Sequence, residues 1–271
     1  MTTMPSLFVS HGAPTFAIHP GRHGQQLSTL GQSLIRPRGI VVISPHWMTA
    51  SIQITANVKP ETIHDFYGFP PALYKLSYVP PGSPALAGEV QKRFQSRGLQ
   101  ASLNTTRGLD HGVWVPLLHL YPDADIPTIQ VSLPIDIDES AAFELGQALR
   151  PLTQTGVLII GSGGLTHNLQ DYKFSDADSP PESYAIEFSR WVRKAVTEGD
   201  KNRLIQALSH APHADRSHPT PEHFMPLLVA AGAAPCLSPV TVLNGGIQHA
   251  CLAMESYVFG QNLSIFDEDN G

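Results

Sequence analysis

The feature that most constrains the fold of this chain is a set of short apolar runs, rich in Val, Ile and Leu and bounded by Pro or Gly. Runs of this kind predict strands that are buried on both faces of a sheet. Segments with helical periodicity lie between them, several with Pro in the first turn or with Asp or Ser just before it. The predicted strands span 6–9, 40–44, 52–56, 126–132, 157–161 and 240–243, and the predicted helices span 24–33, 84–96, 139–152, 181–197, 201–210 and 221–231.

Strands that alternate with helices predict an α/β fold with a central, largely parallel or mixed β-sheet flanked by helices. The composition of 42% hydrophobic and 15% charged residues is sufficient to bury a sizeable core. No shift in composition marks a boundary within the chain. We therefore expect a single domain over residues 1–271.

Composition also excludes several classes of partner. The chain has 17 Lys and Arg against 23 Asp and Glu, a net charge of -6, which argues against nucleic acid. No run approaches the roughly 18 to 20 apolar residues of a membrane span, and no secretion signal is evident. The two cysteines, Cys236 and Cys251, fit a reducing compartment. We expect a cytoplasmic protein without a membrane or nucleic-acid partner, and we make no prediction of its oligomeric state.

Histidines follow three of the predicted strands. His11 comes after LFVS, His46 after VVIS, and His167 closes IIGSGGLTH. Ligands of open α/β sheets bind beyond the carboxyl ends of the strands, so these positions are where a site would be built. Imidazole is also the commonest protein ligand for metals. A single histidine at a strand end can equally be a structural residue that bonds a loop carbonyl, but three such positions favour a site.

Two further histidines lie beside carboxylates. His223 falls just inside a predicted helix start, next to Glu222, which can act as a metal ligand itself or as an acceptor that orients an imidazole. Asp110 precedes His111 at the start of an apolar, Trp-containing segment, and this pairing would tune the imidazole of His111. His249 is expected to begin a last helix and to line the pocket.

Common local motifs are missing from the sequence. There is no HExxH pair, no CxxC companion, no GxSxG elbow and no P-loop lysine beside the glycines of the GSGG segment. We expect the glycines at 161, 163 and 164 to open a turn whose backbone amides face a substrate. A metal site in this chain would therefore be assembled from ligands that are dispersed along the sequence.

Six segments taken in order, SHGAP, ISPHW, HDFYGFP, DHGVWVPL, GSGGLTHNL and TPEHFMPLL, resemble the motif series of the class III extradiol ring-cleaving dioxygenases, specifically the DOPA 4,5-dioxygenase-like branch. The resemblance extends from near residue 6 to residue 228 and continues into the final NGG segment. It implies a non-haem metal centre that opens the ring of a DOPA-like catechol with O2 to give a semialdehyde.

The resemblance also implies roles for particular residues. His11, His46 and His223 carry over as metal ligands, although better-known members of the class use two histidines and a glutamate. His167 carries over as the active-site acid/base, and as a fourth ligand in a resting zinc form. His111 carries over as a histidine that contacts the substrate or oxygen.

The metal and the proton chemistry follow from this ligand set. Three protein ligands on Fe(II) leave positions for a bidentate catecholate and for O2, which makes Fe(II) the expected cofactor for activity. Three imidazoles also suit Zn(II), which the isolated protein can therefore carry. An imidazole with a pKa near neutrality, assigned to His167, accepts the proton that the catechol releases.

Flat side chains near these motifs suit an aromatic substrate. We expect Trp47, Tyr67 and His64 to contact it. Two other functions use the same histidines: a zinc-dependent hydrolase that activates water, and a metal- or ligand-binding protein without catalysis. A requirement for Fe(II) and consumption of O2 distinguish the dioxygenase from both.

Overall fold

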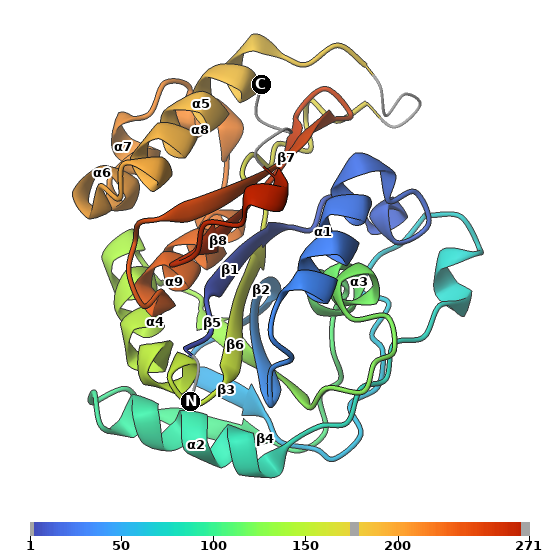
Figure 1. Ribbon diagram of the computed structural model, residues 1–271. Helices are drawn as coiled ribbons and strands as arrows, with labels where there is room; N and C mark the ends of the chain where they lie inside the picture. The colour runs from blue at the N-terminus through green and yellow to red at the C-terminus, as the bar shows by residue number, and fades with distance from the viewer. Residues whose placement is uncertain (1–2, 174–178, 267–271) are drawn as a thin grey trace.

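A computed structural model describes residues 3–173 and 179–266. Its centre is a mixed eight-stranded sheet with the strand order β4-β3-β5-β2-β6-β1-β8-β7 (Figure 1). The strands are β1 Ser6–Ser10, β2 Gly39–Thr49, β3 Ile52–Thr55, β4 Ala101–Asn104, β5 Thr128–Pro134, β6 Val157–Gly163, β7 Val240–Gln248 and β8 Leu252–Phe259. β1, β2, β5 and β6 run parallel to one another, whereas the contacts of β1 with β8, β3 with β5 and β7 with β8 are antiparallel.

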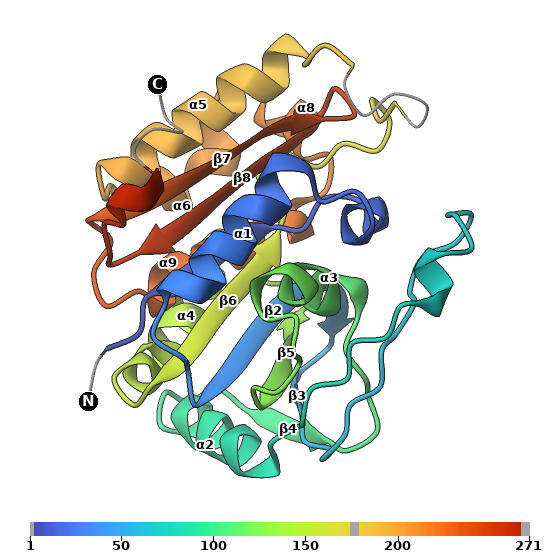
Figure 2. The same ribbon diagram turned by 45° about the vertical axis from the view of Figure 1, so that its right-hand side comes forward.

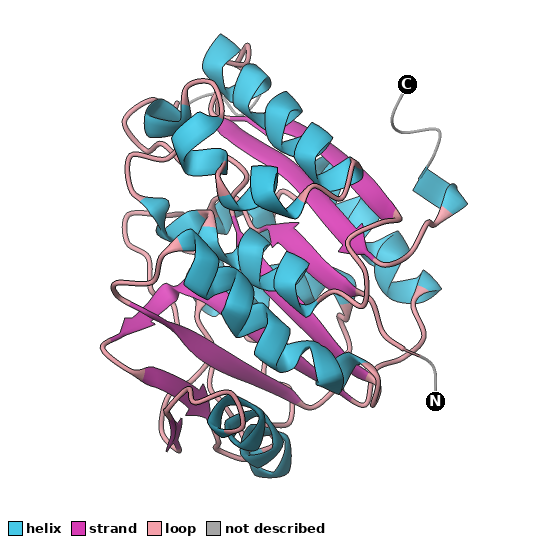
Figure 3. Ribbon diagram, turned by 90° about the vertical axis from the view of Figure 1, so that its left-hand side faces the viewer, coloured by secondary structure: helices cyan, strands magenta, loops and turns pink. Residues whose placement is uncertain are grey.

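Helices cover both faces of the sheet. α1 and α3 lie together on one face, while α4 and α9 pack against each other on the opposite face (Figures 1 and 2). Figure 3 shows the second face and the helices stacked over it. The helices are α1 Gly21–Ser33, α2 Pro84–Gln95, α3 His111–Leu120, α4 Glu139–Thr153, α5 Ser183–Thr197, α6 Lys201–Ile205, α7 Ala207–His210, α8 Ala214–Ser217 and α9 Met225–Ala233.

The central strands contribute apolar side chains to two separate hydrophobic cores, one on each face of the sheet. In β2, Val41 and Ile43 belong to the core that includes α4 and α9, whereas Ile40 and Val42 belong to the core beneath α1 and α3. Alternate residues of a strand point to opposite faces, so an unbroken apolar run is required when both faces are covered. This is why Val and Ile fill β2 from residue 40 to residue 43 without alternating with polar side chains.

The six predicted strands are present, and the α/β class with a mixed sheet is confirmed. Two strands were not predicted, β4 and β8. The segment expected to form a last helix from His249 is instead the turn between β7 and β8, where His249 and Ala250 have φ values of 52° and 68°. A helix cannot start through two left-handed residues, so that prediction is wrong.

Two predicted helices are interrupted. The segment 201–210 divides into α6 and α7 at Gln206, and the segment 221–231 divides into a 3-10 helix, Pro221–His223, and α9. Pro226 lies in the first turn of α9, where its missing N–H cannot bond the carbonyl of Glu222, so the hydrogen bonds of α9 do not extend back into the 3-10 helix. The break leaves His223 in a short turn next to the sheet. Within the described residues, no helix is long and apolar enough to span a bilayer.

Candidate metal centre and active site

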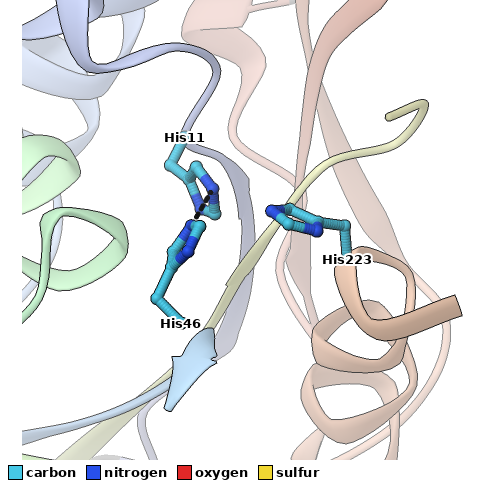
Figure 4. A group of neighbouring side chains, drawn as sticks. All are labelled: His11, His46 and His223. Atoms are coloured by element: carbon cyan, nitrogen blue, oxygen red, sulfur yellow. Dashed lines mark hydrogen bonds between the residues drawn. The ribbon is translucent and has the colours of Figure 1, made fainter. Parts of the chain in front are cut away.

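Three histidine side chains point toward one another at the carboxyl-end side of β1 and β2 (Figure 4). His11 follows β1 directly, His46 lies near the end of β2, and His223 lies in the 3-10 helix before α9. The Nε2 atoms of His11 and His46 are 3.2 Å apart. One ring nitrogen from each of the three residues lies within 4.8 Å of the other two.

A hydroxyl relay determines which nitrogen of His11 faces this group. The Ser162 hydroxyl donates its only proton to the carbonyl of Gly112, so toward His11 Nδ1, 3.0 Å away, it can only accept. Nδ1 therefore carries the proton of His11. The lone pair on Nε2 is directed at the other two histidines.

The same logic applies to His223. Its Nδ1 lies 3.0 Å from Glu222 Oε1, and a carboxylate only accepts, so Nδ1 carries the proton here as well. His223 Nε2 is buried and has no hydrogen-bond partner among the described residues. Glu222 is thus placed as the acceptor that orients His223, the second of the two roles expected for it. Glu222 also forms a group with His167 and His223 whose possible ligand atoms lie within 4.8 Å of one another.

Glycines of β6 bring His223 to the sheet. A Cβ on Gly163 would lie 2.3 Å from the carbonyl oxygen of His223, and the amide of Gly164 donates to that oxygen at 3.0 Å. A Cβ on Gly161 would lie 1.9 Å from the carbonyl oxygen of Pro226. These glycines permit close approach of the segment that carries His223. They do not form the open turn of substrate-facing amides that we expected.

All three rings are held neutral at pH 7. Burial lowers the pKa of His11, His46 and His223 well below the usual 6.5, and neighbouring imidazoles lower it further. For His46, the carboxylate of Asp65 acts in the opposite direction. Neutral imidazoles present lone pairs, which is the form that metals bind. Three neutral nitrogens that face one another, on two buried rings and one half-buried ring, therefore fit a divalent cation.

His167 lies against this group. Its ring stacks on that of His223 with centroids 3.5 Å apart and planes 5° from parallel. Burial, with a smaller contribution from His111, lowers the pKa of His167 to about 4. This is well below the near-neutral value expected from sequence, so the ring is unprotonated at pH 7.

His111 is the first residue of α3, and its ring centroid lies 4.0 Å from that of His46. Asp110 was expected to tune this ring, but its fully buried carboxylate accepts instead from Ser44 and Gln130. The partner of His111 is Asp65, whose Oδ1 lies 3.0 Å from Nδ1. Asp65 and the orienting serine of His11 were both missed by sequence reasoning. Asp65 stands in the HDFYGFP segment that carried the resemblance, so a signal for it was present.

A cavity of about 260 Å³ opens onto the five histidines at 11, 46, 111, 167 and 223. Its other walls are mainly aromatic and aliphatic, and Tyr67, which is 89% exposed, lies in its lining. Trp47 and His64 are not among the lining residues. Trp47 is covered by the guanidinium of Arg107, and His64 Nε2 bonds the carbonyl of Leu76. The principal remaining walls are Phe66, Phe69, Leu169, Tyr172 and Leu252.

The chain matches known proteins over nearly its whole length. A family model described as the catalytic LigB subunit of aromatic ring-opening dioxygenase matches residues 7–260. A 4,5-DOPA dioxygenase extradiol of Escherichia coli (strain K12) is 39% identical over 265 residues, which cover 96% of each chain. A protein of the same name from Beta vulgaris is 39% identical over 260 residues, covering 94% of this chain and 96% of the relative.

A solved structure agrees with these matches. The crystal structure of an uncharacterized protein from Escherichia coli K12 aligns with a TM-score of 0.79 at 33% identity, covering 95% of this chain and all of the other. The hydrolase and the non-catalytic alternatives are not favoured by any of these similarities. The chain belongs to the LigB family of aromatic ring-opening dioxygenases, and it is a metal-dependent extradiol dioxygenase that acts on a small molecule with O2.

Proposed function

We propose that His11, His46 and His223 together bind one Fe(II) ion, and that the enzyme opens the ring of a DOPA-like catechol to a semialdehyde. The observation that carries this proposal is the convergence of three neutral imidazoles. In two of them, His11 and His223, the proton is held on Nδ1, which leaves Nε2 free to bind a metal. An Fe(II) ion held there would supply the centre at which a catechol and O2 meet. Zn(II) suits the same imidazoles, so we propose that the isolated protein can contain it.

His167 is the proposed base. It lines the cavity and stacks on His223, so a catechol bound beside the metal ligands would place a hydroxyl near its ring. Because burial keeps His167 unprotonated at pH 7, it is able to accept the proton of that hydroxyl. Its stacked position beside His223 also supports a role as a fourth ligand in a resting zinc form.

His111 and Tyr67 are proposed to contact the bound substrate or O2. The ring of His111 lies beside that of His46 and lines the cavity, which allows it to bond a substrate or oxygen atom. Tyr67 presents an exposed aromatic face at the cavity. Trp47 and His64 receive no substrate role in this proposal, because neither lines the cavity.

The relatives named 4,5-DOPA dioxygenase extradiol support a catechol of the DOPA type. The cavity walls are largely apolar, with the histidines supplying the polar groups, as suits a flat ring that carries two hydroxyls. We further propose that the chain acts as one catalytic domain and that it works in the cytoplasm. Its two unpaired cysteines support the latter.

The test is anaerobic loading with Fe(II), addition of a catechol panel that includes DOPA, and then admission of air. We expect O2 uptake and a yellow ring-opened product in equal amounts. The variant His223→Ala should lose both, whereas His210→Ala, a change in an exposed helix end away from the cavity, should retain them. Full iron occupancy with neither O2 uptake nor colour from any diol would refute the proposal.

A further inference from the structure

Asp65 reaches into the active site from the loop between β3 and the helix α2, and it contacts one residue twice. Its Oδ1 accepts a hydrogen bond from the backbone N–H of His111 at 2.9 Å and lies 3.0 Å from Nδ1 of the same residue. Its Oδ2 is 3.9 Å from Nδ1 of His46. The shorter distances single out His111 as the main partner.

Asp65 takes the role of the capping side chain that is missing at the N-terminus of α3. Asp110 is the N-cap residue of α3, yet its side chain makes no capping bond because its carboxylate is committed to Ser44 and Gln130. Asp65 supplies the acceptor for the first N–H of the helix from a loop 46 residues earlier in the chain. The same carboxylate oxygen thus accepts from the backbone N–H of His111 and lies 3.0 Å from Nδ1 of its ring.

We propose that Asp65 is a positioning residue that holds the proton of His111 on Nδ1 and directs the free Nε2 into the cavity. This inference rests on the proposed function, in which His111 bonds a substrate or oxygen atom. Nδ1 of His111 is buried, and none of the described residues meets the geometry of a hydrogen bond to it; Asp65 Oδ1, 3.0 Å away, is its ion-pair contact. Since a carboxylate oxygen can only accept, the nitrogen that faces it carries the proton.

The charge state of Asp65 agrees with this role. Burial alone would raise its pKa, but the ring and the backbone N–H of His111 outweigh burial and lower the pKa to about 2. The carboxylate is therefore ionised across the range in which the protein would be assayed. An acceptor of this kind behind an imidazole fixes the tautomer and the orientation of the ring, so its loss affects what the far nitrogen can bond.

A competing role is open to Asp65, because His46, Asp65 and His111 also form a group whose ligand atoms lie within 4.8 Å of one another. If Asp65 acted mainly through His46, its removal would weaken metal binding. If it acts through His111, its removal leaves metal affinity intact and lowers kcat. The two roles therefore separate in a measurement of metal affinity.

The test compares Asp65→Ala, which removes the acceptor, with Asp65→Asn, which keeps an accepting oxygen. Asp125→Ala serves as the matched control, because Asp125 pairs with Arg36 on an exposed surface away from the cavity. In the Zn(II)-loaded protein, 15N NMR of the histidine rings should show His111 protonated at Nδ1 in the wild type and in Asp65→Asn. It should show a mixture of the two tautomers in Asp65→Ala.

The kcat of the Fe(II) enzyme should fall in the variant in which His111 loses its single tautomer. We expect Asp65→Ala to lower kcat by roughly 10- to 100-fold, the usual cost of removing an orienting carboxylate, with little change in KM or in Zn(II) affinity. Asp65→Asn should recover most of that loss. In a His111→Gln background, Asp65→Ala should add less than about twofold, because residues that act through one another are not additive.

The proposal is overturned if His111 keeps its Nδ1 proton in Asp65→Ala, if Zn(II) affinity falls with kcat, or if the two kinetic losses multiply. A wild-type enzyme that opens no catechol refutes the proposed function instead. The NMR comparison then still decides whether Asp65 positions His111, since it does not depend on turnover.

Discussion

Replacing Ser162 by alanine tests the relay that orients His11. The hydroxyl is buried, donates to the carbonyl of Gly112 and accepts from His11 Nδ1. In Ser162→Ala both of these groups lose their partner. The proton of His11 can then move to Nε2, the nitrogen that we propose binds the metal.

The size of the effect follows from the groups left unpaired. Loss of an orienting partner typically costs 10- to 100-fold in metal affinity, which is about 1.4 to 2.8 kcal/mol. Leaving a buried acceptor and a buried donor unsatisfied should also lower the free energy of unfolding by about 2 to 4 kcal/mol in total. Ser162→Ala should therefore bind Zn(II) more weakly and unfold more easily.

Ser6→Ala is the matched control. Ser6 lies in β1, next to β6, is equally buried, and donates its hydroxyl proton to the carbonyl of Ala230 at 2.7 Å, away from the histidines. It should lose stability without losing Zn(II) affinity. Competition titration against a chelator measures affinity, and urea unfolding of the metal-free proteins measures stability. An unchanged affinity in Ser162→Ala, or an equal loss in Ser6→Ala, would refute the relay.

Three further outcomes are expected. Gly112→Ala would place a Cβ 2.3 Å from the hydroxyl oxygen of Ser44 and 3.0 Å from Cδ2 of His46, and it should lower the free energy of unfolding by about 1 to 3 kcal/mol. Gly88→Ala, with open space around it, should raise the free energy of unfolding by up to about 1 kcal/mol in urea titrations, and equal effects of the two changes would contradict the packing described. Burial lowers the pKa of His23 to about 4, so between pH 6.5 and pH 4 this residue binds a proton in the unfolded chain but not in the folded one. As the pH falls through this range, His23 should reduce the free energy of unfolding by on the order of 3 kcal/mol. His23→Gln should make the free energy of unfolding depend less on pH, as measured by melts at a series of pH values. Tyr67→Ala should raise KM severalfold without changing Tm in a thermal melt, and an unchanged KM would exclude Tyr67 from substrate binding.

Local patterns predicted the parts of the fold and site that depend on neighbouring residues. Apolar runs predicted the central strands, and His11, just after β1, converges with His46, which lies inside β2 near its carboxyl end because this strand extends beyond the predicted residue 44 to Thr49. The resemblance brought His223 into the same group. The start of a last helix at His249 could not be distinguished from a hairpin, because the apolar residues of 251–259 fit a buried strand as well as a helix.

What the sequence did not predict depends on contacts between distant segments. Ser162 meets His11 across 151 residues, and Asp65 meets His111 across 46. The adjacent Asp110 was the natural partner for His111 on sequence grounds. Asp110 instead accepts a hydrogen bond from the buried side chain of Gln130, and no local sequence pattern predicts this contact.

The most direct test of the metal site is anomalous diffraction from crystals of the Fe(II)-loaded protein, measured on both sides of the iron absorption edge. We expect one iron peak within bonding distance of the Nε2 atoms of His11, His46 and His223, with Glu222 hydrogen-bonded to His223 and not ligating the iron. A peak held by His46, Asp65 and His111, or one ligated by Glu222 in place of His223, would contradict the account.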